Sequence, residues 1–200
     1  MNTHDIIGVF LDRDGTINEE VDFLSSSDEL HLIEGSAKAI REANQLGLKV
    51  FVITNQSGIA RGFLTEQQLI KIHDHLIKML NDLGAHIDAI YYCPHHPELG
   101  EAPYRILCDC RKPNTGMLQK AVKQFGINLT KSFVIGDRMI DVQTAQAAGA
   151  ASILVLTGYG KTELELCRSN NFHIDFVARN LEEAMKFVKR SVMRLETEPR

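Results

Sequence analysis

The sequence lacks a strong excess of either charge, because 26 acidic and 22 basic residues give a formal net charge of −4. This near balance excludes the basic field of a nucleic-acid-binding protein. The sequence also lacks an apolar run near the roughly 20 residues of a transmembrane helix, and its first residues do not follow the pattern of a signal peptide. We expect a cytoplasmic, monomeric protein without nucleic-acid or membrane partners, with residues 1–200 forming one domain.

Cysteine is too scarce for a disulfide-rich secreted fold, since the chain has only four. Three of them, Cys93, Cys108 and Cys110, lie in one short region beside histidines. A secreted disulfide framework would spread more cysteines through a smaller chain. Metal binding is therefore a better explanation of these residues than disulfides.

The spacing of the cysteines predicts a zinc site. Cys93-Pro-His95 and Cys108-Asp-Cys110 supply three thiolates and one imidazole, as two pairs with one residue inside each pair. This set fits a closed tetrahedral Zn²⁺ site, which has no open position for chemistry and is therefore structural. His96 is an alternative to His95, and buried free cysteines or a redox pair are alternative interpretations. The other histidines of helical segments and turns are expected at the surface: His73, His75 and His86.

Strand and helix periodicities alternate along the chain. The first predicted strand begins at residue 6 and ends at the acids that begin at residue 12. Further strands are predicted at 49–54, 89–92, 132–135 and 152–156. Helices are predicted at 35–46, 65–82, 114–125, 141–148 and after 180. Thr65 and Gln68 form a capping-box pattern, Asn114 and Asn180 are candidate N-caps, and the charged tail 194–200 should fray.

This alternation predicts an α/β fold, a Rossmann-like three-layer sandwich with a mostly parallel sheet and a zinc-binding loop insertion. In such sheets, ligands bind beyond the carboxyl ends of the strands. The polar residues that follow the predicted strands should therefore share one site.

Two carboxylates, Asp12 and Asp14, follow the first strand with one residue between them, so they can project to the same side. With Asp137, which follows a later strand, they form a plausible Mg²⁺ site, because magnesium prefers oxygen ligands. The alternatives are an Asx turn closed by Gly15 and an ordinary strand-to-helix turn at 136–138. A carboxylate can also attack phosphorus, and we predict Asp12 as nucleophile and Asp14 as the group that gives and takes the proton.

Groups that bind phosphate follow the next strands. The segment Thr54-Asn55-Gln56-Ser57 offers hydroxyls and amides to phosphate oxygens, although a polar turn would look the same. Lys112 is the predicted cation for the transferring phosphoryl group, and Arg111 could hold a second anionic group, unless the two are a solvated basic pair. The zinc loop, 93–110, would present both cations to the phosphate.

The segments FLDRDGT, VITNQSG, RKP and VIGDRMID together resemble the four motifs of the haloacid dehalogenase superfamily of phosphatases, in the expected order. The insertion CPHHP…CDCRKP is similar to that of its zinc-containing branch, whose members act on heptose bisphosphates or on histidinol phosphate. TNQSGIARG and CRKPNTGM resemble the heptose enzymes more closely. The resemblance implies a sugar-phosphate substrate and an open site without a large cap domain. The non-enzymatic alternative is a zinc-stabilised binding module.

The resemblance also implies residue roles. Asp12 would be the nucleophile, Asp14 the acid and base, Asp137 a magnesium ligand, and Thr54 and Lys112 would stabilise the phosphoryl group. Substrate contacts are expected at the following residues: Glu20, Val21, Asp22, Phe23, Asn55, Gln56, Ser57, Arg111 and Arg138. The chain departs from the heptose enzymes at Asp22-Phe23, where they usually have Gly-Tyr, which puts the contacts of that segment in question.

Overall fold

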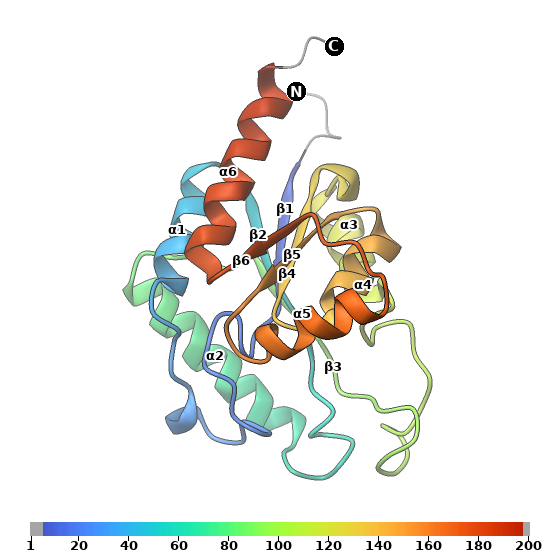
Figure 1. Ribbon diagram of the computed structural model, residues 1–200. Helices are drawn as coiled ribbons and strands as arrows, with labels where there is room; N and C mark the ends of the chain where they lie inside the picture. The colour runs from blue at the N-terminus through green and yellow to red at the C-terminus, as the bar shows by residue number, and fades with distance from the viewer. Residues whose placement is uncertain (1–5, 198–200) are drawn as a thin grey trace.

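A computed structural model describes residues 6–197 and shows six parallel strands in one sheet (Figure 1). The strand order is β3-β2-β1-β4-β5-β6, so the first strand lies in the middle of the sheet. The strands have the following bounds: β1 Gly8–Leu11, β2 Lys49–Asn55, β3 Ala89–Cys93, β4 Phe133–Gly136, β5 Ala151–Val155 and β6 Phe176–Ala178. This arrangement confirms the predicted α/β fold with a parallel sheet.

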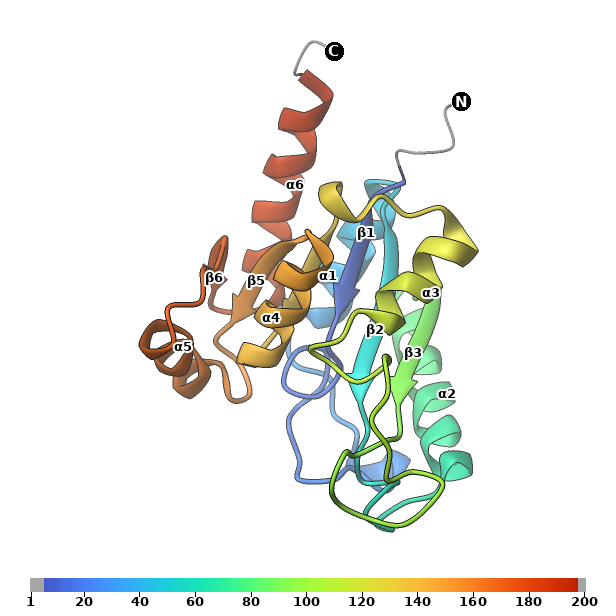
Figure 2. The same ribbon diagram turned by 90° about the vertical axis from the view of Figure 1, so that its right-hand side faces the viewer.

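Helices cover both faces of the sheet (Figure 2). Helices α1, α2 and α6 pack on one face, and α3 and α4 pack on the other, with α5 against α4. Their bounds are α1 Ser36–Gln45, α2 Glu66–Asp82, α3 Gly116–Phe125, α4 Met139–Ala148, α5 Gly160–Ser169 and α6 Leu181–Thr197. Two short 3-10 helices, Ser27–Glu29 and Leu129–Lys131, complete the described elements.

The central strands are apolar on both faces, because helices bury each of them. In β1, Val9 and Leu11 enter the core beneath α1, α2 and α6, while Phe10 between them enters the core beneath α3 and α4. Phe10 pairs in register with Phe51 of β2, and their rings stack with centroids 5.1 Å apart. Each such side chain contributes roughly 1.5–3 kcal/mol when it is fully buried, so the edge that carries the polar residues is held rigidly.

Most predicted elements are confirmed to within two residues at their ends, as are the capping box of α2 and the cap of α6 by Asn180. Some details differ from the prediction. Helix α4 begins at Met139, two residues before its predicted start, and α5 and β6 were not predicted. Thr115 rather than Asn114 is the N-cap of α3, since the Asn114 amide donates to the Cys108 carbonyl. Residues 194–197 of the tail that was expected to fray belong to α6, and 198–200 lie outside the described residues.

The carboxyl ends of the strands meet at one edge, where the loops after β1, β2 and β3 gather (Figure 2). Within residues 6–197, no further layer of helices or strands covers this edge, in agreement with the expected lack of a large cap domain. Over the same residues, no helix has both the length and the apolar character needed to cross a membrane.

Candidate active site

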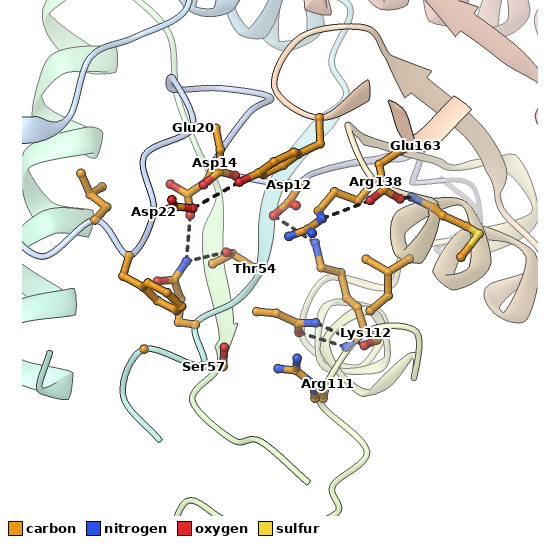
Figure 3. Close-up of a pocket in the computed structure, with 18 of the residues that line it drawn as sticks. Asp12, Asp14, Glu20, Asp22, Thr54, Ser57, Arg111, Lys112, Arg138 and Glu163 are labelled. Atoms are coloured by element: carbon orange, nitrogen blue, oxygen red, sulfur yellow. Dashed lines mark hydrogen bonds and ion pairs between the residues drawn. The ribbon is translucent and has the colours of Figure 1, made fainter. Parts of the chain in front are cut away.

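A pocket of about 530 Å³ opens at the carboxyl edge of the sheet (Figure 3). Acidic side chains, among them Asp14 and Glu20, lie on one side of it, and Arg111 lies on the opposite side. The predicted site residues that line the pocket are Asp12, Asp14, Glu20, Val21, Asp22, Phe23, Thr54, Asn55, Gln56, Ser57, Arg111, Lys112 and Arg138. The sequence therefore identified most of the polar lining, while Asp137 is completely buried beneath it.

Asp12 follows β1 directly, and its backbone N–H still donates to the Ile135 carbonyl of β4 at 2.9 Å. Its Oδ1 accepts from the Arg13 backbone N–H at 2.8 Å and lies 3.0 Å from Lys112 Nζ. Among the described residues, these contacts end on Oδ1 and leave Oδ2 for a reacting group. Burial raises the pKa of Asp12 to about 6, although the Lys112 charge counteracts this effect.

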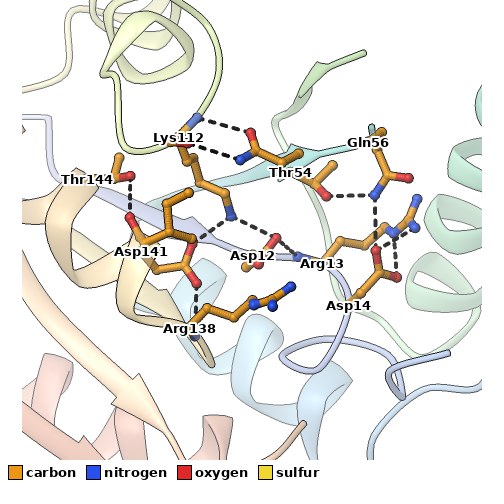
Figure 4. Close-up of polar contacts among 11 residues, drawn as sticks. Asp12, Arg13, Asp14, Thr54, Gln56, Lys112, Arg138, Asp141 and Thr144 are labelled. Carbon is orange, nitrogen blue, oxygen red and sulfur yellow. Dashed lines mark hydrogen bonds and ion pairs between the residues drawn. The ribbon is translucent and has the colours of Figure 1, made fainter. Parts of the chain in front are cut away.

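Lys112 reaches the floor of the pocket from the loop that precedes α3, and only 2% of its surface is exposed. Its Nζ lies between Asp12 and Asp141, 2.6 Å from Asp141 Oδ1 (Figure 4). Burial alone would lower the pKa of Lys112, but the two carboxylates outweigh burial and raise it. The Asn55 side chain exchanges two hydrogen bonds with the Lys112 backbone, at 3.0 and 3.2 Å, and so fixes the lysine relative to β2.

Asp14 accepts hydrogen bonds from four donors on three side chains, of which Figure 4 shows those of Arg13 and Gln56. Arg13 donates through Nε to Oδ1 at 2.9 Å and through Nη2 to Oδ2 at 2.6 Å. Asn18 donates to Oδ1 at 2.9 Å and Gln56 donates to Oδ2 at 3.0 Å. Burial raises the pKa of Asp14, but the Arg13 charge and these hydrogen bonds outweigh it, so the pKa lies below its usual range.

Three carboxylates could hold a metal ion. Asp12, Asp137 and Asp141 each place an oxygen within 4.8 Å of the others, whereas the Asp14 carboxylate is not in this group. The Asp137 Oδ1 atom is buried and has no hydrogen-bond partner among residues 6–197, which a cation would remedy. Burial, reinforced by the Asp12 charge, raises the pKa of Asp137 to about 8. Oxygen donors of this kind fit Mg²⁺.

The four predicted zinc ligands come together at the end of β3. The sulfur atoms of Cys93, Cys108 and Cys110 lie 3.2–3.5 Å apart, and His95 Nδ1 lies 3.4 Å from Cys110 Sγ. Three sulfurs and one imidazole nitrogen at these separations fit a tetrahedral Zn²⁺ site. His96 lies outside the cluster, because its Nδ1 accepts from the backbone N–H groups of residues 98 and 99.

The zinc loop also positions Arg111. Its Nη1 donates to the His95 carbonyl at 3.0 Å, so the arginine is tied to one of the four cluster residues while it lines the pocket. Arg61 also lines the pocket, and its guanidinium lies 5.4 Å from the Phe23 ring centroid. Within residues 6–197, neither arginine forms an ion pair with a carboxylate.

A set of contacts that the sequence did not predict links two sides of the pocket. The Tyr159 hydroxyl donates to Asp22 at 3.2 Å, and the Arg138 guanidinium lies 4.7 Å from the Tyr159 ring centroid. Arg138 Nε is also 3.8 Å from Glu163. The Tyr159 backbone N–H donates to Asp137 at 2.8 Å. The β5–α5 loop thus connects the residue 22 segment with the buried carboxylates.

Three residues of the pocket lining or the carboxylate cluster were not among the predicted site residues: Asp141, Tyr159 and Glu163. Asp141 had a signal, because it is an acid in the first turn of α4, only four residues after the predicted metal ligand Asp137 at the end of β4. Tyr159 and Glu163 lie at the start of α5, which was not predicted. Glu20, which was predicted, has a pKa raised to about 7 by burial and by the charges of Asp14 and Asp12.

This chain is similar to known proteins in both sequence and fold. A family model described as HAD-hydrolase-like matches residues 109–184. The D-glycero-beta-D-manno-heptose-1,7-bisphosphate 7-phosphatase of Photorhabdus laumondii is 41% identical over 190 residues, which cover 94% of this chain and 100% of that relative. The Escherichia coli K12 protein of the same name is 42% identical over 151 residues, covering 75% and 79%. The crystal structure of the D,D-heptose 1,7-bisphosphate phosphatase of B. bronchiseptica, complexed with magnesium and phosphate, superposes with a TM-score of 0.81 at 34% identity, covering 92% of this chain and 99% of that one.

Proposed function

We propose a substrate and mechanism from the premise that this chain belongs to the family of heptose-1,7-bisphosphate 7-phosphatases in the haloacid dehalogenase superfamily. It is a phosphoric monoester hydrolase. Its proposed reaction is removal of the 7-phosphate of D-glycero-D-manno-heptose 1,7-bisphosphate, as a step toward nucleotide-activated heptose. The second candidate substrate is histidinol phosphate.

Asp12 and Asp14 divide the proposed chemistry. In the first step, an Asp12 oxygen attacks phosphorus, the bond to the sugar oxygen breaks, and Asp14 gives its proton to that oxygen. In the second step, Asp14 takes a proton from the water that attacks the aspartyl-phosphate, and phosphate is released. The four donors around Asp14 favour the carboxylate that the second step uses. A dianionic phosphate beside Asp14 favours the protonated form that the first step uses.

Neighbouring groups orient the phosphoryl group. Lys112 lies 3.0 Å from the nucleophile and supplies a positive charge where negative charge develops. The Thr54 hydroxyl accepts from the Gln56 amide at 2.8 Å, which directs its own proton toward another acceptor, such as a phosphoryl oxygen. Thr54 belongs to β2, and the Asn55 side chain of the same strand holds the Lys112 backbone, so the geometry is fixed before the substrate binds.

Two metals complete the proposal. Asp12 and Asp137, with Asp141 beside them, would hold Mg²⁺, which supplies charge that stabilises the phosphoryl oxygens when bound. Asp14 is assigned to proton transfer rather than to this set, because its carboxylate faces Arg13, Asn18 and Gln56. Cys93, His95, Cys108 and Cys110 would hold a structural Zn²⁺ that keeps Arg111 in place.

The observation that carries the choice of substrate is the pair of pocket arginines without carboxylate partners among residues 6–197, Arg61 and Arg111. A bisphosphate brings a second dianion, and its binding energy can be used to orient the reacting phosphate. Histidinol phosphate would bring an ammonium group instead, which the two arginines repel.

The test compares kcat/KM for D-glycero-D-manno-heptose 1,7-bisphosphate and for histidinol phosphate. We expect a preference of at least about a hundredfold for the bisphosphate, or roughly 2.7 kcal/mol. Arg111→Ala should reduce that ratio more than it slows hydrolysis of p-nitrophenyl phosphate. Equal kcat/KM values, or a preference for histidinol phosphate, would refute the substrate while leaving the phosphatase class intact.

A further inference from the structure

His73 is a buried histidine outside the pocket lining, and the mechanism above does not use it. It lies on α2 and was expected at the surface, as histidines of helices and turns usually are, but only 6% of it is exposed. Its Nε2 lies 3.2 Å from Nη1 of Arg13. Arg13 is itself completely buried, although it directly precedes Asp14 at the edge of the pocket.

The Arg13 guanidinium connects His73 to Asp14. It uses Nε and Nη2 for the two oxygens of Asp14, at 2.9 and 2.6 Å, and Nη1 for His73. A guanidinium is a planar fork, so fixing Nη1 on one side fixes the plane and direction of the two donors on the other side. The His73 ring therefore sets the orientation in which Arg13 presents itself to the Asp14 carboxylate.

His73 is suited to this role because it is a neutral acceptor. Arginine can only donate, so the contact requires a lone pair on Nε2 and the proton on Nδ1. Burial and the neighbouring Arg13 charge lower the pKa of His73 to about 3, so the ring stays neutral at physiological pH. The ring packs against Tyr92, with centroids 5.8 Å apart, and Tyr92 donates to Glu66 at the start of α2 at 2.6 Å. These contacts hold the acceptor in one place.

We propose that His73 is a positioning residue for proton transfer: through Arg13 it holds the Asp14 carboxyl group in the orientation that reaches the leaving oxygen of the substrate. The inference rests on the proposed role of Asp14 as acid and base. It does not depend on the heptose substrate, because any ester with a poorly leaving alcohol needs that proton. Misplacement of a reacting group by about 1 Å can cost up to a hundredfold in rate, so loss of the His73 acceptor should be measurable.

The test compares two substrates with different needs for a proton. Fructose 1,6-bisphosphate releases a sugar alkoxide, which must be protonated, whereas p-nitrophenyl phosphate releases a phenolate that leaves without a proton. For His73→Leu, which removes the acceptor, we expect kcat/KM for the sugar phosphate to fall about tenfold and that for p-nitrophenyl phosphate to change less than about twofold. His73→Gln, which retains an acceptor oxygen, should restore the sugar phosphate value to within about threefold of the original enzyme.

Three further variants make the result decisive. Asp14→Asn is the benchmark and should show the same selective loss more strongly. Ile72→Ala removes buried apolar volume beside His73 and should lower stability without any selective loss. His73→Phe, a second side chain without an acceptor, replaces His73→Leu if that variant does not fold.

Each outcome has a definite meaning. A selective loss in His73→Leu or His73→Phe, rescued in His73→Gln, supports the inference. If Asp14→Asn is selective but the His73 variants lose activity equally on both substrates, or lose none, the inference is overturned. If Asp14→Asn itself treats both substrates alike, the acid and base role fails, and the positioning role of His73 fails with it.

Discussion

Replacing His73 by glutamine should reduce the loss in the free energy of unfolding that occurs as the pH is lowered. In the folded chain the ring is buried beside Arg13 and its pKa is lowered from 6.5 to about 3. In the unfolded chain the imidazole is free to bind a proton below pH 6.5. Between about pH 6.5 and pH 3 the unfolded state therefore binds more protons, and the free energy of unfolding falls as the pH is lowered through this window.

The size of this effect follows from the two pKa values. A shift of one unit corresponds to about 1.36 kcal/mol, and integration from pH 7 to pH 5 attributes a loss of about 2 kcal/mol to His73. Glutamine does not titrate, so the loss between these two pH values should be about 2 kcal/mol smaller in His73→Gln. Above pH 7 the His73 contribution no longer depends on pH, and the two curves should run parallel.

Urea unfolding at pH 7, 6 and 5, followed by circular dichroism, measures this difference. The matched control is His75→Gln, on the exposed side of the same helix, which should leave the pH dependence unchanged. Parallel curves for His73→Gln and the original protein between pH 7 and pH 5 would show that His73 is protonated in the fold. The acceptor geometry inferred for Arg13 would then be untenable.

Asp12→Asn should lower kcat by at least about a thousandfold while the circular dichroism spectrum stays unchanged, because an amide is a poor nucleophile; near-normal turnover would rule out the covalent mechanism. Cys108→Ser should reduce zinc from about one ion per chain and destabilise the fold by about 3 kcal/mol or more, since structural zinc contributes folding free energy; elemental analysis that finds no zinc in the original protein, prepared without chelators, would contradict this. Tyr159→Phe removes the 3.2 Å bond to Asp22, worth about 1 kcal/mol, and should raise KM for the bisphosphate about fivefold with little change in kcat; an unchanged KM would show that this bond does not shape the pocket.

The parts of the fold that sequence predicted are those whose burial is visible in the residues themselves. Strands β1 and β2 are apolar on both faces, and the acids or amides that follow them mark the edge where they end. Helix α5 escaped prediction because only Gly160 and Cys167 are buried in it. Strand β6 has only the three residues Phe176–Ala178, too few to show a period.

In the candidate site, too, the residues whose position was visible in the sequence were predicted and the others were not. Residues that directly follow a strand, such as Asp12, were assigned from position alone. The roles of Asp141 and Tyr159 depend on tertiary placement: the first on α4 beginning at Met139, and the second on a helix that was not predicted. His73 was expected at the surface because most histidines of helices and turns lie there, and the sequence cannot show that a buried arginine from another element will need an acceptor.

The ion pairs of Lys112 have a consequence for the order in which ligands bind. Lys112 pairs with Asp12 and Asp141, and Asp137 places an oxygen within 4.8 Å of those two carboxylates, so three ionised carboxylates would exceed this single ammonium group by two negative charges. A divalent cation cancels these charges, whereas a monovalent cation leaves one negative charge that repels an incoming phosphate dianion. Metal and phosphate should therefore bind cooperatively, with the metal first. Phosphate alone should bind weakly, and bound phosphate should in turn raise the affinity for the metal by the same factor.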